Sequence, residues 1–354
     1  MNVFKNFEED DIVRGNPTEV TTGLWTNGTG SLTTFFTGGL ALSSSGEYYW
    51  DIYNINPTSS TAEIQFSIAY GHRTGGGAPS LAQSDTALLA TQAVYSQYRA
   101  LVLDPGDSQF TFANNWSSDH IYAINIARAR IKERLDPGNW QLTLSGSAGT
   151  RTFVDDSGQS LGSQFGRSGA VFNIVSGSLS GSSGSVTNAT ASLSGGFGLF
   201  YPSLGLLLLN PDAIALTVGW GSGSYYTMAS HSAFAPVTTS QATVQYNHAA
   251  LYRSMKLAAQ GGGDFQARSS ENISSTHYFI RLRNKEFNYT NNPTFFDETN
   301  GNINQVTFIN DPRVYATTFG LYNDQNDLIA VAKSSRPIQK SFDREVLIRA
   351  RLDF

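Results

Sequence analysis

The sequence predicts a mainly β protein with a few helices (α+β), built from antiparallel, sandwich-like sheets with a Gly/Ser-rich β insertion. Three observations predict this class. Charged residues make up 14% of the 354 residues, against roughly 25% in an ordinary soluble domain. Aromatic residues reach 12%, which a disordered chain does not have. Short runs rich in β-branched and aromatic residues alternate with turn-forming pairs such as Asn56-Pro57.

The first predicted domain, residues 1–145, is rich in strands. "YYWDIYNI" (48–55) and "AEIQFSIAY" (62–70) are aromatic and β-branched. From Ile64 to Ile68 apolar residues alternate with polar ones, which is the pattern of a half-buried strand.

Residues 86–103, "TALLATQAVYSQYRALVL", are predicted to form the longest helix of this domain. Ser84 or Asp85 can cap its start, and Asp104-Pro105-Gly106 ends it. Beyond it we expect strands at 122–126 and 140–144, with a short helix within 127–135.

The second predicted domain, residues 146–225, is the Gly/Ser-rich insertion. Alternation from Val171 to Val175 favours a small β-meander over a flexible linker. The tip near 178–185 is either a mobile turn of this meander or a disordered loop. Strands at "LGLLLLN" (204–210) and "IALTVGW" (214–220) are expected to complete the sheet.

The third predicted domain, residues 226–354, combines a helix with a C-terminal sheet. The helix is expected within 241–260 and a strand at 277–282. Further strands are expected at "QVTFI" (305–309), "VYATTFGLY" (314–322) and "DLIAVAKSS" (327–335), with a hairpin turn at Asn323 to Asn326. "EVLIRARLDF" alternates up to the last residue, which predicts a terminal strand paired in a sheet.

Composition excludes several functions. Cysteine is absent, so disulfides, thiolate metal sites and Cys nucleophiles are impossible. The net charge is −5 with no long basic run, so we expect no nucleic-acid partner. The longest apolar run, Leu204 to Leu209, is far too short for a membrane helix. The acidic start "MNVFKNFEEDD" lacks the apolar region of a secretion signal, so we expect folding in a cytoplasm and no membrane partner.

We find no catalytic or metal-binding pattern and therefore expect a non-enzymatic protein without cofactors. The five histidines have no helical pair spacing, so no metal site is expected. Phosphate-loop and nucleophile-elbow motifs are absent. The acidic doublets Asp155-Asp156 and Asp297-Glu298 are interpreted as solvated loops. Glu8 to Asp11 is interpreted as solvated or facing a partner.

"ARARIKER" (127–134) is the only basic cluster. It can form ion pairs between subunits, for example with Glu8 to Asp11. It can equally be the polar face of an amphipathic helix that needs no function. The sequence leaves both interpretations open.

Five stretches spread over most of the chain together resemble virion structural proteins of contractile-tailed bacteriophages, especially marine T-even-type phages: "QFSIAYGHRTGGG", "AVYSQYRALVL", "IYAINIARARIKERLDPGNWQLTLSG", "GLFYPSLGLLLLNP" and "TTFGLYNDQNDLIAVAKSSRPIQKSFDREVLIRARLDF". The ending is similar to the C-terminal strand of T-even-type baseplate wedge proteins, where Arg-Pro leads into a final strand that ends on Phe. The resemblance implies a β-rich structural subunit of the virion, assembled in the host cytoplasm. Its implied partners are other tail or baseplate proteins, in a homo- or hetero-oligomer.

We expect interfaces at a glycine-rich loop, the basic cluster and the C-terminal strands: Arg73, Gly75, Gly76, Gly77, Arg128, Arg130, Arg134, Arg336, Arg349, Arg351 and Phe354. One alternative is a neck, collar or capsid-associated structural protein. Another is a receptor-binding or glycan-degrading tail protein, which needs carboxylates placed across an aromatic groove.

Overall fold

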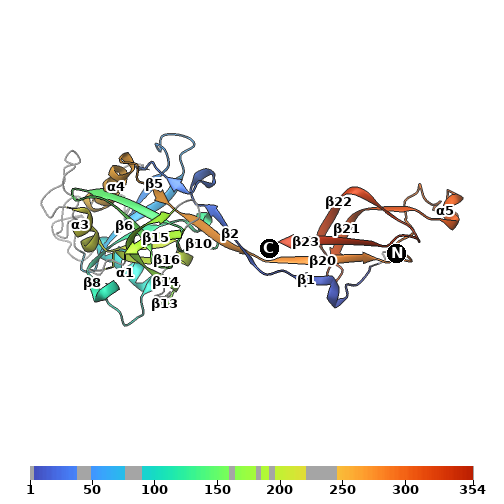
Figure 1. Cartoon of the computed structure of the whole chain (residues 1–354), viewed down its shortest axis with the longest axis horizontal. Helices are drawn as coiled ribbons and strands as arrows, with labels where there is room; N and C mark the ends of the chain where they lie inside the picture. Colours follow the sequence, from blue (N-terminus) through green and yellow to red (C-terminus); the bar gives the residue numbers. More distant parts are fainter. Residues whose placement is uncertain are drawn as a thin grey trace. The chain divides into compact units, whose positions relative to one another are not determined.

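The computed structural model (Figure 1) describes residues 4–37, 49–75, 90–158, 164–180, 185–190, 196–220 and 245–353. Contacts divide the chain into two units. The small unit combines Met1–Glu19 with Asn272–Phe354, and the large unit is Val20–Glu271. The predicted three-domain division differs from this one. The predicted boundary after residue 145 falls inside strand β11 (Gln141–Gly146), and the two ends of the chain share the small unit because an N-terminal strand pairs with a C-terminal one.

The large unit is built around a 13-stranded antiparallel sheet. Eleven strands follow one another in the order β3-β18-β11-β12-β14-β16-β17-β9-β6-β5-β4, and β13 and β15 pair with β14. Besides β11, the bounds of these strands are β3 Ser31–Leu32, β4 Phe36–Thr37, β5 Tyr49–Tyr53, β6 Ile64–His72, β9 His120–Asn125, β12 Gly149–Asp155, β13 Gln164–Gly166, β14 Gly169–Ser180, β15 Ser185–Thr190, β16 Gly198–Tyr201, β17 Leu206–Leu209 and β18 Phe265–Gln266.

Helices and short strands complete the large unit. The helices are α1 (Ala90–Val102), α2 (Arg128–Ile131), α3 (Pro211–Val218) and α4 (Gln245–Gln260). The strand β10 (Arg134–Leu135) lies in a second sheet with β2 (Thr18–Gly23) and β19 (Arg268–Ile273), while β7 (Phe110–Phe112) pairs with β8 (Trp116–Ser118).

The main sheet is buried on both faces. Along β17, Leu207 and Leu209 belong to one hydrophobic cluster, and Leu206 and Leu208 belong to another. Helix α1 packs on the second face, where Tyr95 lies so close that a Cβ on Gly71 would come within 2.8 Å of its backbone nitrogen. A strand that is buried on both faces has a continuous run of apolar residues in its sequence, which explains the four consecutive leucines of β17.

The expected strand at 214–220 is wrong, because residues 214–218 belong to helix α3 and Gly219 is its C-cap. The Asn210 side chain accepts hydrogen bonds from the backbone N–H groups of Asp212 and Ala213, and Pro211 begins the helix. Gly219 ends it at φ +78° in the left-handed region. These cap signals are visible in the sequence, and they prevail over the β-branched composition of the segment.

The Gly/Ser-rich segment is not a separate meander. Its strands β14, β16 and β17 are consecutive members of the main sheet, and β15 pairs with β14 as the second strand of a hairpin. Residues 181–184, the centre of the expected tip, lie outside the described residues.

Among its described residues, the small unit has two small sheets, one short α-helix and one short 3₁₀-helix. Strands β1 (Ile12–Arg14), β20 (Ser275–Leu282) and β23 (Val346–Asp353) form one sheet, and β21 (Val314–Tyr322) pairs with β22 (Leu328–Lys340) in the other. The expected strand at 305–309 is wrong, because Thr307–Asn310 form helix α5. Within the described part of the chain this stretch pairs with no strand, and its apolar side chains Val306 and Ile309 are exposed.

Most other predicted elements are confirmed. The structure contains the helices expected within 86–103 and 241–260, as α1 and α4, although residues 84–89 and 241–244 lie outside the described part. It also contains the strands at 62–70, 140–144 and 277–282, the hairpin turned at Asn323 to Asn326, and the C-terminal strand. The chain is mainly β with antiparallel sheets, as the sequence predicts.

Candidate assembly surface

The predicted interface residues lie in both units. Arg73 follows β6 and forms an ion pair with Asp119 at 2.5 Å. Gly75 adopts φ +85°, while Gly76, Gly77 and Phe354 lie outside the described residues. Arg349 and Arg351 alternate on one face of β23, and Arg336 lies on β22. The structure therefore brings Arg349 and Arg351 together, both in the small unit.

The basic cluster is engaged within the large unit. Arg128 donates to the Ser203 carbonyl at 2.7 Å, and Arg130 forms an ion pair with Glu63 at 3.1 Å. Arg134 lies half-buried in β10. The hydrogen bond from Thr26 and that from Arg130 lower the pKa of Glu63. These contacts favour a structural role for the cluster.

The acidic N-terminal segment is also paired within its own unit. Glu8 forms an ion pair with Arg283 at 3.1 Å, and Asp11 lies 3.5 Å from Arg281. Asp11 is buried, so the interpretation of the whole segment as solvated is wrong at this residue. We predicted that this segment could pair with the basic cluster of another subunit. Both groups, however, already have ionic partners within their own unit.

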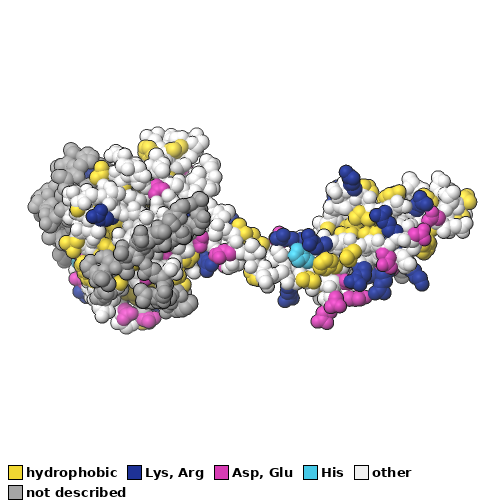
Figure 2. Space-filling model, in the orientation of Figure 1, with side chains coloured by type: hydrophobic (Ala, Val, Ile, Leu, Met, Phe, Trp, Pro, Cys, Tyr) yellow, Lys and Arg dark blue, Asp and Glu magenta, His cyan; other side chains and the backbone are white. Residues whose placement is uncertain are grey.

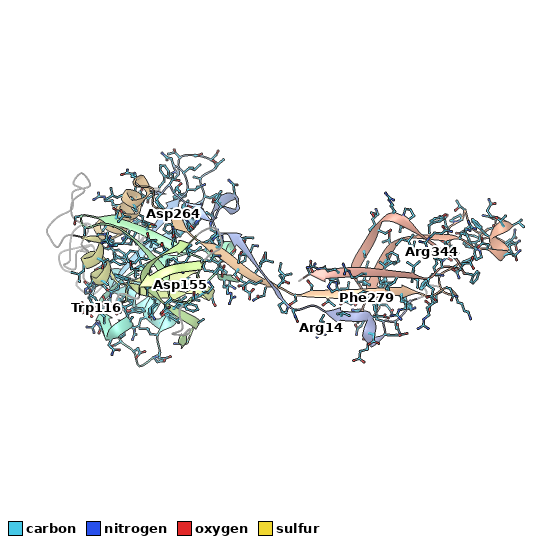
Figure 3. The ribbon with its side chains drawn as sticks, viewed as in Figure 1. Arg14, Trp116, Asp155, Asp264, Phe279 and Arg344 are labelled. Carbon is cyan, nitrogen blue, oxygen red and sulfur yellow. The ribbon has the colours of Figure 1, made fainter. Side chains whose placement is uncertain are left out.

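The expectation that Asp155 and Asp156 lie in a solvated loop is wrong. Asp155 (Figure 3) is fully buried at the end of β12 and accepts hydrogen bonds from the backbone N–H groups of Gly138 and Ser157. Asp156 accepts from the backbone and side chain of Asn173. Burial raises the pKa of Asp155. These carboxylates hold Gly138 of the Asp136-Pro137-Gly138 turn and Asn173 within β14.

A partly buried polar cluster in the large unit was not expected from the sequence. The pairing of β6 with β9 places His72 opposite His120, with their ring centres 5.9 Å apart. His120 Nδ1 lies 3.0 Å from the Tyr70 hydroxyl, and its Nε2 lies 2.9 Å from Asp212 Oδ1. The spacing of the histidines in the sequence does not indicate this pair, because the register between two strands brings them together.

The electrostatics of this cluster favour a structural role. The hydrogen bond from His120 is the main cause that lowers the pKa of Asp212. Burial lowers the pKa of His72 and strongly raises that of Tyr70. Within the described residues, no group of three His, Asp or Glu side chains could hold a metal ion. The cluster ties β6 and β9 to the first turn of α3.

The exposed apolar side chains are concentrated in the small unit. Among the described residues, fourteen of the eighteen exposed large hydrophobic side chains belong to it: Phe4, Ile12, Val13, Phe287, Tyr289, Val306, Ile309, Tyr315, Tyr322, Leu328, Ile329, Val331, Phe342 and Leu347. Of the buried hydrophobic residues in the described part of the chain, five belong to it: Leu282, Phe295, Val314, Leu321 and Ala350. Figure 2 shows apolar side chains at the surface over β21 and β22.

Four of these side chains form a continuous group that we call the hairpin patch: Phe4, Tyr322, Leu328 and Val331. The rings of Phe4 and Tyr322 pack edge to face at 5.0 Å. Tyr322 and Leu328 lie over Gly320, where a Cβ would come within 2.8 Å and 3.1 Å of them, and Val331 pairs with Gly320 across the hairpin. Each member is at least 44% exposed, so a partner could cover all four.

A wide bulge shapes the same hairpin. Ala316 pairs with Ile338, whereas Thr318 pairs with Lys333, so Ser334 to Pro337 stand opposite Thr317 alone. The exposed Arg336 sits in this bulge. Bulges bend a strand and limit uncontrolled edge pairing.

Polar contacts compensate for the small core of this unit. Lys340 is 1% exposed, and its ammonium donates to the carbonyls of Asn284 and Ser341 and to the side-chain oxygen of Asn288, each at 2.9 Å. Lys5 pairs with Glu286 at 2.7 Å, and this hydrogen bond lowers the pKa of Glu286.

No protein-family model matches the chain, and no curated protein or solved structure is significantly similar to it. Among the described residues, no helix is long and apolar enough to cross a membrane.

Proposed function

We propose that the chain is a non-enzymatic structural subunit of a bacteriophage tail, most specifically of the baseplate wedge. In this proposal the large unit is a self-sufficient body, and the small unit attaches it to neighbouring virion proteins. The sequence resemblance supplies the phage context. The main support for the attachment role is that exposed apolar side chains are concentrated in the small unit, which buries few apolar side chains among its described residues.

The energetics support this division of roles. Covering a large apolar side chain contributes about 1.5–3 kcal/mol, and the hairpin patch offers four such side chains side by side. An obligate interface buries roughly 2,000 Å² or more. Isolated exposed apolar residues are ordinary, whereas contiguous groups mark interaction sites.

The test measures co-assembly. The purified full chain is analysed by size exclusion with light scattering, alone and mixed with proteins encoded beside it in its genome. We expect a defined complex with one or more of them. A particle that ignores these proteins and degrades host polysaccharide would refute the proposal and favour the glycan-active alternative.

A matched pair of variants assigns the surface. Val331→Asp places a charge in the hairpin patch and is expected to weaken co-assembly at least about tenfold, since a buried unpaired charge opposes association. Leu216→Asp is the control, because Leu216 is 77% exposed on α3 of the large unit. Equal loss in both variants would show that the hairpin patch is not the interface.

A further inference from the structure

Strand β23 leaves one edge of its sheet open. It is the last strand in the order β1-β20-β23, and its eight residues pair with β20 along their whole length. Within the described residues, no backbone hydrogen bond joins β23 to any other segment. In an antiparallel pair, alternate residues direct their N–H and C=O groups away from the partner. The edge can therefore accept another strand.

The side chains of β23 differ between its two faces. Leu347, Arg349, Arg351 and Asp353 are exposed, whereas Ala350 is buried and Val346, Ile348 and Leu352 are partly covered. A strand added to this edge would continue both faces. It would need apolar residues beside Ile348 and Ala350. On the other face it would need residues whose charge does not repel arginine.

The exposed face of the sheet carries unbalanced positive charge. Arg349 lies opposite Phe279, which is labelled in Figure 3, and has no hydrogen bond or ion pair within the described chain. Arg351 lies opposite His277 and pairs with Asp353 at 2.6 Å. Arg281, opposite Leu347, lies on the same face and forms an ion pair with Asp11 at 3.5 Å. Arg349 is therefore the arginine of this face that has no ionic partner within the described chain.

A second copy of the chain is a poor occupant of this edge. Among the antiparallel registers that keep the exposed side chains of both copies on one face, two give the longest overlap of β23 with a copy of itself. One of them places Arg349 opposite Arg351, and the other places Arg349 opposite itself. Like charges directly opposite each other destabilise a strand pair, and charged edge strands resist self-association.

We propose that β23 binds an extended segment of a partner protein in which carboxylates alternate with apolar residues. The segment adds a strand to the sheet, with its carboxylates beside Arg349 and Arg351 and its apolar residues beside Ile348 and Ala350. Main-chain hydrogen bonds provide affinity, and the alternating side chains provide selectivity. This inference rests on the proposed attachment role of the small unit and names the chemistry of one partner.

The experiment uses the full chain and synthetic peptides of the same length as β23. The probe is a fluorescein-labelled peptide that alternates valine and glutamate, and its binding is followed by fluorescence anisotropy. A second peptide replaces every glutamate with lysine. A third keeps the glutamates but carries N-methyl groups on alternate amides along the edge that would pair. We expect only the first to bind well, with the other two weaker by at least about tenfold.

Variants locate the site. Arg349→Glu is expected to weaken the binding of the glutamate peptide about tenfold and to strengthen the binding of the lysine peptide. Arg336→Glu is the control, because it makes the same charge change at an exposed position on another sheet of the same unit. Circular dichroism verifies that both variants are folded.

Three results would overturn the inference: no binding of the glutamate peptide, equal binding of the N-methylated peptide, or equal effects of the two variants. Equal binding of the N-methylated peptide would indicate simple charge attraction without strand pairing. None of these results bears on Val331→Asp, so failure here is distinguishable from failure of the proposed attachment role.

Discussion

The large and small units use their apolar residues in opposite ways. In the large unit the main sheet has hydrophobic clusters on both faces, and helix α1 packs against one of them. In the small unit, two sheets of three and two strands leave Val331 and Leu347 more than half exposed. Sheets with an uncovered apolar face are stable only with additional support. Among the described residues, the large unit buries most of its large apolar side chains, whereas the small unit leaves most of its own at least partly exposed.

The two units also differ in how polar groups contribute. In the large unit, buried groups such as Asp155 and Tyr70 sit inside an already large core. In the small unit, one buried ammonium, that of Lys340, connects the end of β22 to the segment that contains Asn284 and Asn288. A unit with few buried apolar residues depends more heavily on each such contact.

The largest expected effect comes from core truncation in the large unit. Leu208→Ala should lower its free energy of unfolding by about 2–5 kcal/mol, because Leu208 is fully buried and truncation of its side chain leaves a cavity. Leu328→Ala, at an exposed position of the hairpin patch, should change the stability of the isolated protein by less than about 0.5 kcal/mol.

Tryptophan fluorescence during urea unfolding measures the first of these changes selectively. All five tryptophans belong to the large unit: Trp25, Trp50, Trp116, Trp140 and Trp220. Hydrogen exchange at the β21 and β22 amides follows the small unit. A large loss of stability in Leu328→Ala would mean that the hairpin patch is part of a core, and the comparison would fail.

The next effect in size concerns Lys340. Lys340→Met keeps an unbranched apolar stem but removes the ammonium, which leaves the oxygens of Asn284, Asn288 and Ser341 without this donor and should destabilise the small unit by about 1–3 kcal/mol. Hydrogen exchange in β22 should accelerate, while the tryptophan transition stays unchanged. Lys333→Met, at an exposed position of the same strand, is the control. A shift of the tryptophan transition would show that the two units unfold together.

Local patterns predict much of the fold. The alternation in β6, β11 and β23 and the turn at Asn323 give correct elements, because each is a short-range property of the chain. The two wrong strands fail for different reasons. At 214–220 the cap residues Asn210 and Gly219 decide the structure. At 305–309 apolar composition suggests a strand, but no strand among the described residues pairs with it.

The candidate surface could be predicted only in part. The exposed arginines of the final strand follow from its alternation, so Arg349 and Arg351 are identifiable from sequence. The hairpin patch is not, because Phe4 and Tyr322 are far apart in the chain and meet only in the fold. For the same reason, sequence spacing cannot show that His72 and His120 face each other, or that Asp155 is buried.

The smallest expected effect is an acid response confined to the large unit. The folded-state pKa of Asp212 is lowered, chiefly by the hydrogen bond from His120. A carboxylate with a lowered pKa contributes stability that is present above its unfolded-state pKa and lost as pH falls through the folded-state pKa. The contribution should therefore be intact at pH above about 4 and decline below it.

Asp212→Asn should remove this part of the acid response and cost less than about 1 kcal/mol near neutral pH, since the Asp212 side chain is about half exposed and solvent weakens the pair. The measurement compares urea midpoints from tryptophan fluorescence for the variant and the original protein across the acidic range. The two midpoints should differ near neutral pH and converge at low pH. A difference that grows on acidification would contradict the role of the ionised Asp212. An equal change in hydrogen exchange at β22 would contradict the separation of the two units.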